Sequence, residues 1–258
     1  MLDCFISGTD TGIGKTIVAS AIIRALRADG VAALGMKPIA SGAVMTREGL
    51  RSEDALALAA AAKAELMGGP EPLRRGGRPS DQAVLDYRDV NPYCFGPAVS
   101  PHIAAREAGV AIDLAVICHH LERLRARSDC VIVEGAGGLL APIDEEGQSM
   151  ADLAAALSLP VLIVVGLRLG CLNHARLTLE ALRARGLRYA GWIANAVDPA
   201  FERASENLLT LGRLLGEPPL ERMPHAPPSD VRLVAAARAI RARLALASAA
   251  IESPPQEL

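Results

Sequence analysis

Aromatic residues are scarce in this chain, and long hydrophobic runs are missing. Only 3% of its 258 residues are aromatic although 51% are hydrophobic, so the core must be built from Ala, Val, Leu and Ile. Such a core favours a layered α/β protein in which helices pack closely on a sheet. No apolar stretch reaches the ~20 residues of a membrane-spanning helix, and no signal peptide precedes the first apolar segment. We therefore expect a cytoplasmic α/β protein with no membrane partner.

An excess of charge of one sign and paired cysteines are also absent. The formal net charge is −2, so no strong field recruits nucleic acid, and nucleic acid is not expected as a partner. The cysteines have no paired spacing and several lie in apolar, strand-like runs, which indicates reduced core cysteines. They are Cys4, Cys94, Cys118, Cys130 and Cys171.

Lysine is rare although arginine is used freely. The three lysines are Lys15, Lys37 and Lys63. In an Arg-rich chain, a lysine is expected where its compact ammonium is needed, because the guanidinium of Arg cannot mimic it. Lys63 lies in an Ala-rich helical run, where chance retention is the simpler interpretation.

The segment around Lys15 predicts a phosphate-binding loop. A short apolar strand over residues 4–6 breaks at Gly8, and a helix follows over residues 17–26. In a loop that connects a strand to a helix in this way, backbone N–H groups and the positive end of the helix bind phosphate. Lys15 can reach the β- and γ-phosphates, and the hydroxyl of Thr16 can bind magnesium. The usual pattern has its glycine one residue after Gly8, but the strand–loop–helix setting still predicts a nucleotide site.

Polar residues recur where other predicted strands end. Lys37 and Ser41 follow a strand over residues 31–36, and Glu134 follows a strand over residues 130–133. Open α/β sheets bind ligands at the carboxyl ends of their strands. A carboxylate in that position, followed by glycines, suits magnesium coordination. Asn173 and Asn195 come after two further predicted strands, 160–165 and 189–194.

Strands and helices alternate along the chain, which predicts one doubly wound, mostly parallel sheet flanked by helices. We expect a single domain over residues 1–250, with a flexible insertion at 68–81 and a frayed tail at 251–258. Further helices are predicted over residues 52–67, 113–127, 200–215 and 230–249, and a helix ending near 185 follows the Asn173 loop. Residues 91–95 and 100–102 read as turn-rich.

The stretches that carry these polar residues are similar to one family. The matching stretches include Gly8-Thr-Asp-Thr, Lys37-Pro-Ile-Ala-Ser-Gly, Asp54-Ala-Leu-Ala-Leu, Val133-Glu-Gly-Ala-Gly-Gly, Leu169-Gly-Cys-Leu-Asn-His and Gly191-Trp-Ile-Ala-Asn. Over nearly its whole length, to about residue 226, the chain resembles the dethiobiotin synthetases of biotin biosynthesis. The resemblance implies a P-loop NTPase-like fold and an ATP-dependent, C–N bond-forming ligase.

The resemblance also implies which residues bind ATP and magnesium. The ATP site would comprise Gly12, Ile13, Gly14, Lys15, Thr16, Ile17, Asp54, Glu134, Gly135, Ala136 and Gly137, with adenine near Asn195, Ala196, Pro224, His225 and Ala226. Magnesium would be held by Thr16, Asp54 and Glu134. Position alone would make Asp54 only a first-turn carboxylate favoured by the helix dipole.

The implied substrates are 7,8-diaminopelargonate, CO2 and ATP. One amine adds CO2 to give a carbamate, the carbamate attacks the γ-phosphate to give a carbamic-phosphoric anhydride, and the second amine closes the ureido ring. Because two anions must meet, cations have to screen both of them. The catalytic residues would be Lys15, Lys37 and Thr11, and the diamine would contact Ser41, Lys37, Gly138 and Asn173.

The family resemblance further implies a homodimer in which Asn173 of the partner subunit meets the substrate carboxylate. The chain departs from the family at Gly12 and Ala196, where acidic residues are common, and its segment 68–81 matches no family motif.

Two alternatives share the broad fold. A partition or cell-division ATPase switch carries a signature lysine five residues before the loop lysine, where this chain has Asp10. The Arg-bearing segment 230–249 could mimic the membrane-binding amphipathic helix of such an ATPase. The simpler interpretation is that this Ala-rich segment packs on the sheet. An ATP-dependent amidotransferase-type ligase is the second alternative, but no glutaminase region follows the domain.

Overall fold

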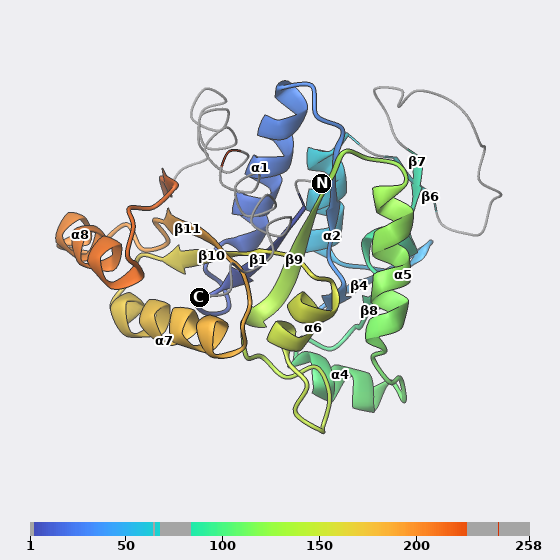
Figure 1. Ribbon diagram of the computed structural model, residues 1–258. Helices are drawn as coiled ribbons and strands as arrows, with labels where there is room; N and C mark the ends of the chain where they lie inside the picture. Colours follow the sequence, from blue (N-terminus) through green and yellow to red (C-terminus); the bar gives the residue numbers. More distant parts are fainter. Residues whose placement is uncertain (1–2, 64, 68–83, 226–241, 243–258) are drawn as a thin grey trace, which may run out of the picture.

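The computed structural model describes residues 3–63, 65–67, 84–225 and 242. Within these residues, a central sheet of six parallel strands has the order β12-β11-β10-β1-β9-β2 (Figure 1). The strands are β1 Cys4–Gly8, β2 Ala33–Met36, β9 Cys130–Gly138, β10 Val161–Gly166, β11 Tyr189–Asn195 and β12 Glu221–Met223. The predicted α/β fold with a parallel sheet is confirmed.

The direction of the chain through the sheet reverses at β1. From β1 the chain runs outward to β2, whereas from β9 it crosses back over β1 to β10, β11 and β12. Because such crossovers are right-handed, opposite directions place their helices on opposite faces. Accordingly, α1, which follows β1, lies on one side of the sheet, and α6 and α7, which follow β9 and β10, lie on the other (Figure 1). Ligands bind beside a reversal of this kind, at the carboxyl ends of the strands.

The helices vary in length from short turns to several full turns. They are α1 Lys15–Ala28, α2 Glu53–Ala61, α3 Tyr87–Val90, α4 Pro101–Glu107, α5 Leu114–Arg125, α6 Met150–Ala156, α7 Cys171–Ala184 and α8 Ala204–Leu215. Among the described residues, no helix is both long and apolar enough to cross a membrane.

The core is built from aliphatic strands covered on both faces. Every residue of β1 and of β10 is buried, and β10 reads as a continuous apolar run because helices cover both faces of a parallel sheet. The helices approach closely: a Cβ at Gly35 would lie 2.7 Å from the Cβ of Leu58 on α2 and 2.9 Å from the Cδ1 of Ile23 on α1. All five cysteines are free, as predicted.

Several elements differ from the sequence-based expectation. The helix predicted over 52–67 ends at Ala61, and Lys63 takes a left-handed φ of 51° that stops it. Two segments predicted to be turns contain regular structure: 91–95 includes a short strand, and 100–102 includes the start of α4. Short pairs outside the main sheet were not predicted: β3 Ile39–Ala40 with β8 Tyr93–Cys94, β4 Val44–Thr46 with β5 Gly49–Arg51, and β6 Glu65–Met67 with β7 Val84–Asp86.

Three predicted features lie outside the described part of the chain. The insertion at 68–81, the helix over 230–249 and the tail at 251–258 fall on residues that the structure does not describe, apart from residue 242.

A buried carboxylate ties α3 to α5. Asp89, only 1% exposed, accepts hydrogen bonds from Nε of Arg123 at 2.6 Å and shares one with Nδ1 of His120 at 2.8 Å. Burial by itself would raise the pKa of Asp89, but the hydrogen bonds and charges of His120 and Arg123 outweigh it and lower the pKa. This contact fixes the position of α3, whose residues reach the candidate site.

Replacing this carboxylate should weaken the fold in a pH-dependent way. We expect Asp89→Asn to lower the free energy of unfolding by about 2 kcal/mol at pH 7, the scale of hydrogen bonds to a charged group. Because the folded-state pKa of Asp89 is depressed, its contribution is present above the unfolded pKa of ~3.9 and is lost as pH falls through the folded pKa. Urea titrations from pH 7 to pH 3 should therefore show that the difference in free energy of unfolding between Asp89→Asn and wild type becomes smaller as the pH falls. The exposed pair of Glu180 with Arg176 provides the control, since Glu180→Gln should change little at any pH.

Candidate active site

The phosphate-binding loop lies between the carboxyl end of β1 and the start of α1. Gly14 has a φ of 81°, and a Cβ built there would lie only 2.2 Å from Nδ2 of Asn195. That amide donates to the carbonyl of Ile13 at 2.7 Å and so holds the loop against the end of β11. The ammonium of Lys15 folds back to donate to the carbonyl of Asp10 at 2.9 Å. The loop is thus held from both sides at the start of α1, where backbone N–H groups and the helix dipole favour phosphate.

Gly14→Ala should abolish this arrangement. The methyl group would collide with Asn195 and force a left-handed conformation on alanine, so we expect ATP affinity to fall at least ~10-fold. Gly30→Ala is a matched control, because Gly30 has a φ of 80° and nothing lies within 4 Å of a Cβ placed on it. Gly14→Ala should lose more thermal stability than Gly30→Ala, because it adds the collision with Asn195 to a similar backbone strain. Calorimetric titration with a non-hydrolysable ATP analogue should show a loss of affinity in Gly14→Ala alone. Equal affinities would show that the loop tolerates the methyl group.

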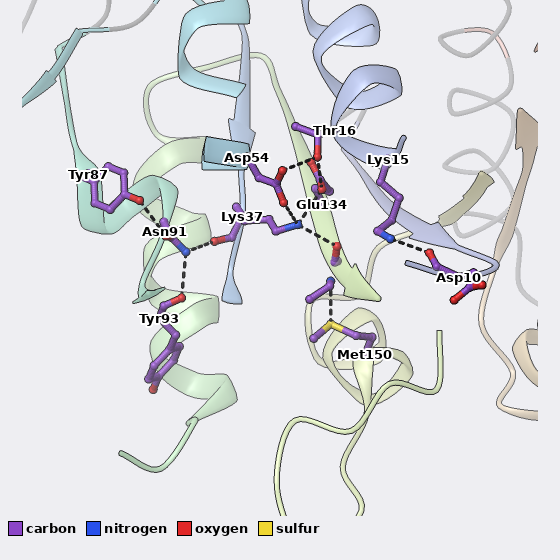
Figure 2. A network of polar contacts seen from close by, with 12 residues as sticks. Asp10, Lys15, Thr16, Lys37, Asp54, Tyr87, Asn91, Tyr93, Glu134 and Met150 are labelled. Atoms are coloured by element: carbon purple, nitrogen blue, oxygen red, sulfur yellow. Dashed lines mark hydrogen bonds and ion pairs between the residues drawn. The ribbon is translucent and has the colours of Figure 1, made fainter. Parts of the chain in front are cut away.

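Four side chains meet beside this loop at the carboxyl ends of β2 and β9 (Figure 2). The ammonium of Lys37 lies 2.7 Å from Oδ2 of Asp54, 2.7 Å from Oε1 of Glu134 and 3.3 Å from the carbonyl of Gly135. The hydroxyl of Thr16 lies 2.8 Å from Oδ1 of Asp54 and 2.9 Å from Oε1 of Glu134. The three predicted magnesium ligands and the predicted catalytic lysine therefore form one cluster.

Lys37 and Glu134 are buried in the cluster, whereas the side chain of Asp54 is 42% exposed, and the charges of these three residues depend on one another. Lys37 is 4% exposed and Glu134 is 1% exposed. Burial by itself would lower the pKa of Lys37, but the charges of Glu134 and Asp54 and the hydrogen bonds to them outweigh it and raise the pKa. Burial would raise the pKa of Asp54, but Lys37 and the hydroxyl of Thr16 lower it. Lys37 is thus held as a cation and Asp54 as an anion at neutral pH.

Lys15 is in a different electrostatic state from Lys37. Burial, followed by the charge of Lys37, lowers the pKa of Lys15 to about 8. Its ammonium makes its hydrogen bond to a neutral carbonyl rather than to a carboxylate. A polyphosphate bound in the loop would supply the negative charge that this ammonium lacks.

The donor set fits magnesium shared with a nucleotide. Oε2 of Glu134 is buried and has no hydrogen-bond partner among the described residues, so one lone oxygen faces the cluster. The other oxygens come from the carboxylate of Asp54 and the hydroxyl of Thr16. Among the described residues, no group of three or more His, Cys, Asp and Glu side chains could enclose a metal ion. Magnesium typically takes one or two carboxylates and completes its shell with water and substrate phosphates.

Other predicted residues line the loop or the end of β9. Thr11, Gly12 and Ile17 are exposed on the loop and the first turn of α1. Gly138 pairs with Gly8 of β1, and a Cβ at Gly137 would lie 3.7 Å from Oγ1 of Thr11. Gly135, Ala136, Gly137 and Gly138 belong to β9, which is longer than predicted, and Ser41 is half-buried just after β3.

The residues predicted for adenine and for the substrate carboxylate lie at other strand ends. Nδ1 of His225 lies 3.2 Å from the carbonyl of Ala196, so the ends of β11 and β12 adjoin there, with Pro224 between β12 and His225. Ala226 falls outside the described residues. Asn173 is exposed near the start of α7, and in the described part of the chain no hydrogen bond joins it to the Lys37 cluster.

Sequence reasoning missed two buried polar residues next to the cluster. Tyr87 on α3 and Asn91, just after this helix, connect the backbone of Ser52 to that of Lys37. Figure 2 shows the part of this link between Tyr87, Asn91 and Lys37. The only signal in the sequence was Asn91-Pro, which reads as a turn. Nothing local indicates that Tyr87 reaches a residue 35 positions away.

Known families and proteins include clear relatives of this chain. A family model described as an AAA domain matches residues 3–73 and 79–231. ATP-dependent dethiobiotin synthetase BioD of Aromatoleum aromaticum is 49% identical over 90% of this chain and 94% of the relative. The enzyme of the same name from Xanthomonas campestris pv. campestris (strain 8004) is 46% identical over 86% of this chain and 91% of the relative. The chain belongs to the dethiobiotin synthetase family. It is therefore an ATP-dependent ligase of biotin synthesis.

Solved structures extend the likeness at the level of the fold. The cell-division ATPase MinD of Pyrococcus furiosus superposes with a TM-score of 0.51 at 16% identity, covering 97% of this chain and all of that one. The MinC:MinD complex of Aquifex aeolicus gives 0.50 at 14% identity over 99% of this chain and 98% of that one. At these identities only the fold is shared, so dethiobiotin synthetase membership takes precedence over the cell-division alternative.

Proposed function

We propose that this member of the dethiobiotin synthetase family converts 7,8-diaminopelargonate, CO2 and ATP into dethiobiotin, ADP and phosphate, acting in the cytoplasm. The observation that carries the proposal is the cluster in which a buried Lys37 ammonium lies 2.7 Å from two carboxylates beside a phosphate-binding loop. A phosphoryl transfer between two anions needs cations on both sides of the transferred group, and this chain keeps two of its three lysines there.

The proposed reaction balances in three steps. A substrate amine attacks CO2, forming a C–N bond and releasing a proton, which leaves a carbamate anion. A carbamate oxygen attacks the γ-phosphorus, and the bond between that phosphorus and the β–γ bridging oxygen breaks as ADP leaves. The second amine attacks the carbonyl carbon of the anhydride and gives up one proton, which the departing phosphate or solvent accepts. The ureido ring closes as phosphate leaves with the C–O bond pair.

The roles of the protein groups follow from their positions. Lys15 and the loop amides would bind the β- and γ-phosphates, and Lys37 would place its charge against the oxygens of the transferred group. The hydroxyls of Thr11 and Ser41 would donate hydrogen bonds to the same anionic groups. Thr16, Asp54 and Glu134 would hold Mg2+, which neutralises polyphosphate charge when bound. Gly135, Ala136, Gly137 and Gly138 would let substrate approach the backbone.

Adenine is proposed to bind where β11 and β12 end. Asn195, Ala196, Pro224 and His225 lie at these strand ends, one strand beyond β10 from the phosphate-binding loop. Asn195 already holds the loop through the carbonyl of Ile13, so the base and the phosphates would be positioned by the same residue. Ala196 stands where the family commonly has an acid, so backbone groups would carry more of the recognition here.

The diamine is proposed to bridge two subunits of a homodimer. Its reactive end would lie at Lys37 and Ser41, and its aliphatic acid would extend to Asn173 of the partner subunit at the start of α7. Backbone N–H groups and the dipole at the start of this helix favour an anion. The exposed position of Asn173, apart from the Lys37 cluster, supports a contact made to another subunit.

Subunit mixing tests the composite site. Asn173→Ala should raise the KM for the diamine about 10-fold, the scale of a lost hydrogen bond to a charged group, with ATP affinity unchanged. An equal mixture of Asn173→Ala and Lys37→Ala, assayed below that KM, should recover up to roughly a quarter of wild-type activity, because half of the random dimers carry one intact site. Additive activities despite demonstrated exchange would mean that each site is built within one chain.

Dependence of ATP hydrolysis on substrate tests the function itself. A synthetase should hydrolyse ATP only when both the diamine and bicarbonate are present, since transfer requires the carbamate. A cell-division-type switch would hydrolyse ATP without either, and an amidotransferase-type ligase would need glutamine or ammonia. Release of phosphate that ignores the diamine would refute the proposal.

A further inference from the structure

The backbone of Lys37 is held by a segment outside the main sheet. Lys37 follows the last residue of β2, and its N–H donates to the carbonyl of Val90 at 2.7 Å. Its carbonyl accepts a hydrogen bond from Nδ2 of Asn91 at 2.7 Å. Both main-chain groups of Lys37 are therefore satisfied by residues 90–91, at the end of α3. The next residue, Pro38, has no N–H, so it cannot anchor this point with a donor of its own.

The same segment also holds the start of α2. The hydroxyl of Tyr87 accepts a hydrogen bond from the N–H of Ser52 at 2.7 Å and donates to Oδ1 of Asn91 at 3.0 Å. Ser52 is the N-cap of α2, and Asp54 lies two residues further on in its first turn. One continuous path of hydrogen bonds thus runs from Ser52 through Tyr87 and Asn91 to the carbonyl of Lys37. Figure 2 shows the part of this path from Tyr87 to Lys37.

The path is buried and well anchored. Tyr87 is 5% exposed and Asn91 is 2% exposed. The guanidinium of Arg51 lies 4.2 Å from the centroid of the Tyr87 ring, and Nδ2 of Asn91 makes a second bond, to the carbonyl of Tyr93, at 3.0 Å. Asp89 fixes the same short helix to α5. Neither side chain is free to adapt without breaking other contacts.

We propose that Tyr87 and Asn91 are positioning residues that set the placement of Lys37 relative to Asp54. The two groups of the ion pair come from different strands and helices, and this path fixes their two backbones to each other. Neither Tyr87 nor Asn91 touches the reacting atoms. The inference rests on the proposed function, in which the Lys37 charge must meet the transferred phosphoryl group. A displacement of about 1 Å at such a site can cost ~10²-fold in rate.

Tyr87→Phe tests the inference with the removal of one oxygen atom. It leaves the N–H of Ser52 and Oδ1 of Asn91 without this hydroxyl, so the two backbones can shift relative to each other. We expect kcat for dethiobiotin formation to fall about 10-fold, with the KM values for ATP and diamine within about 2-fold of wild type. Tyr93→Phe is the matched control, because its hydroxyl bonds the backbone of Asp113 at the surface and its carbonyl is unchanged. It should leave kcat at the wild-type value. Tyr87→Phe should lower Tm more than Tyr93→Phe does, because it leaves two buried groups without a hydrogen-bond partner.

A double-mutant cycle separates positioning from general weakening of the fold. If Tyr87 acts through Lys37, Tyr87→Phe should have no further effect on kcat in a Lys37→Ala background. A loss of the same size in both backgrounds, or a loss no greater than that of Tyr93→Phe, would overturn the inference.

A crystal structure of Tyr87→Phe provides a readout that needs no turnover. The distance from the Lys37 ammonium to Oδ2 of Asp54 should lengthen from 2.7 Å. An unchanged distance would overturn the inference even if the proposed function held. If wild-type enzyme formed no dethiobiotin, the proposed function would fail, while this distance would still decide the positioning role.

Discussion

Lys37→Ala is expected to lower kcat at least ~10²-fold, the usual scale for losing a charge that stabilises a transition state. The ammonium is the only basic group seen within hydrogen-bond distance of both Asp54 and Glu134 in the described part of the chain. No other lysine can substitute, because Lys15 is committed to the phosphate-binding loop. The measurement is steady-state turnover at saturating ATP, bicarbonate and diamine.

Lys37→Arg should also be poor, although it keeps the charge. The ammonium donates to three oxygens within 3.3 Å in a buried site, and a planar guanidinium cannot point its donors in those directions without displacing its neighbours. The exposed Lys63 offers the control, since neither Lys63→Ala nor Lys63→Arg should alter kcat. Near-normal turnover in both Lys37 variants would show that Lys37 has no catalytic role.

The position of Lys37 also predicts a competition with magnesium. Its ammonium lies against the same two carboxylates that are proposed to hold the metal. Without the ammonium, two neighbouring carboxylates would repel each other, and a divalent cation would relieve that repulsion. Addition of MgCl2 should therefore raise the Tm of Lys37→Ala more than that of wild type. NaCl at the same ionic strength supplies the control for general screening.

Glu134→Gln is the second substitution with a large expected effect. It keeps the shape of the side chain but removes a buried negative charge, and it turns an amide toward the Lys37 ammonium. Loss of a metal ligand should cost at least the 10–100-fold seen for residues one shell further out, so the magnesium concentration for half-maximal activity should rise at least ~10-fold. Glu146→Gln, at an exposed position, should leave the magnesium dependence unchanged.

The structure of a complex with magnesium and a non-hydrolysable ATP analogue would test the same ligand set. Oxygens of Thr16, Asp54 and Glu134 should lie within ~2.5 Å of the ion or one water away. If Asp54 lay far from the metal in this complex, Asp54 would be only a carboxylate that stabilises the first turn of α2. An unaltered magnesium dependence in Glu134→Gln would likewise contradict the assignment.

Much of the site could be predicted because it depends on the ends of parallel strands. The strands that precede Lys15 and Lys37 and the strand that carries Glu134 were recognisable as short apolar runs, and their carboxyl ends necessarily meet at one edge of the sheet. The cluster in which Lys37, Asp54 and Glu134 touch follows from that geometry. Asp54 also needed the family resemblance, since a carboxylate in the first turn of a helix is common without any ligand.

The parts that escaped prediction depend on contacts between distant residues. The run from Glu53 to Met67 is rich in Ala and favours a helix throughout, so the stop at Lys63 has no local signal. The link from Tyr87 to Ser52 joins residues 35 positions apart, and Asn91 reaches Lys37 across 54 positions. Asn195 was predicted only beside adenine, whereas its amide also holds the phosphate-binding loop. Side-chain networks of this kind become visible only when the backbone path is known.

The identity of the product tests the central claim most directly. The purified protein, supplied with ATP, magnesium, 13C-bicarbonate and 7,8-diaminopelargonate, should form dethiobiotin that carries one 13C in its ureido carbonyl. One ADP should appear for each dethiobiotin, because each ring closure consumes one phosphoryl transfer. Mass spectrometry that finds ADP without labelled dethiobiotin would contradict the proposed function.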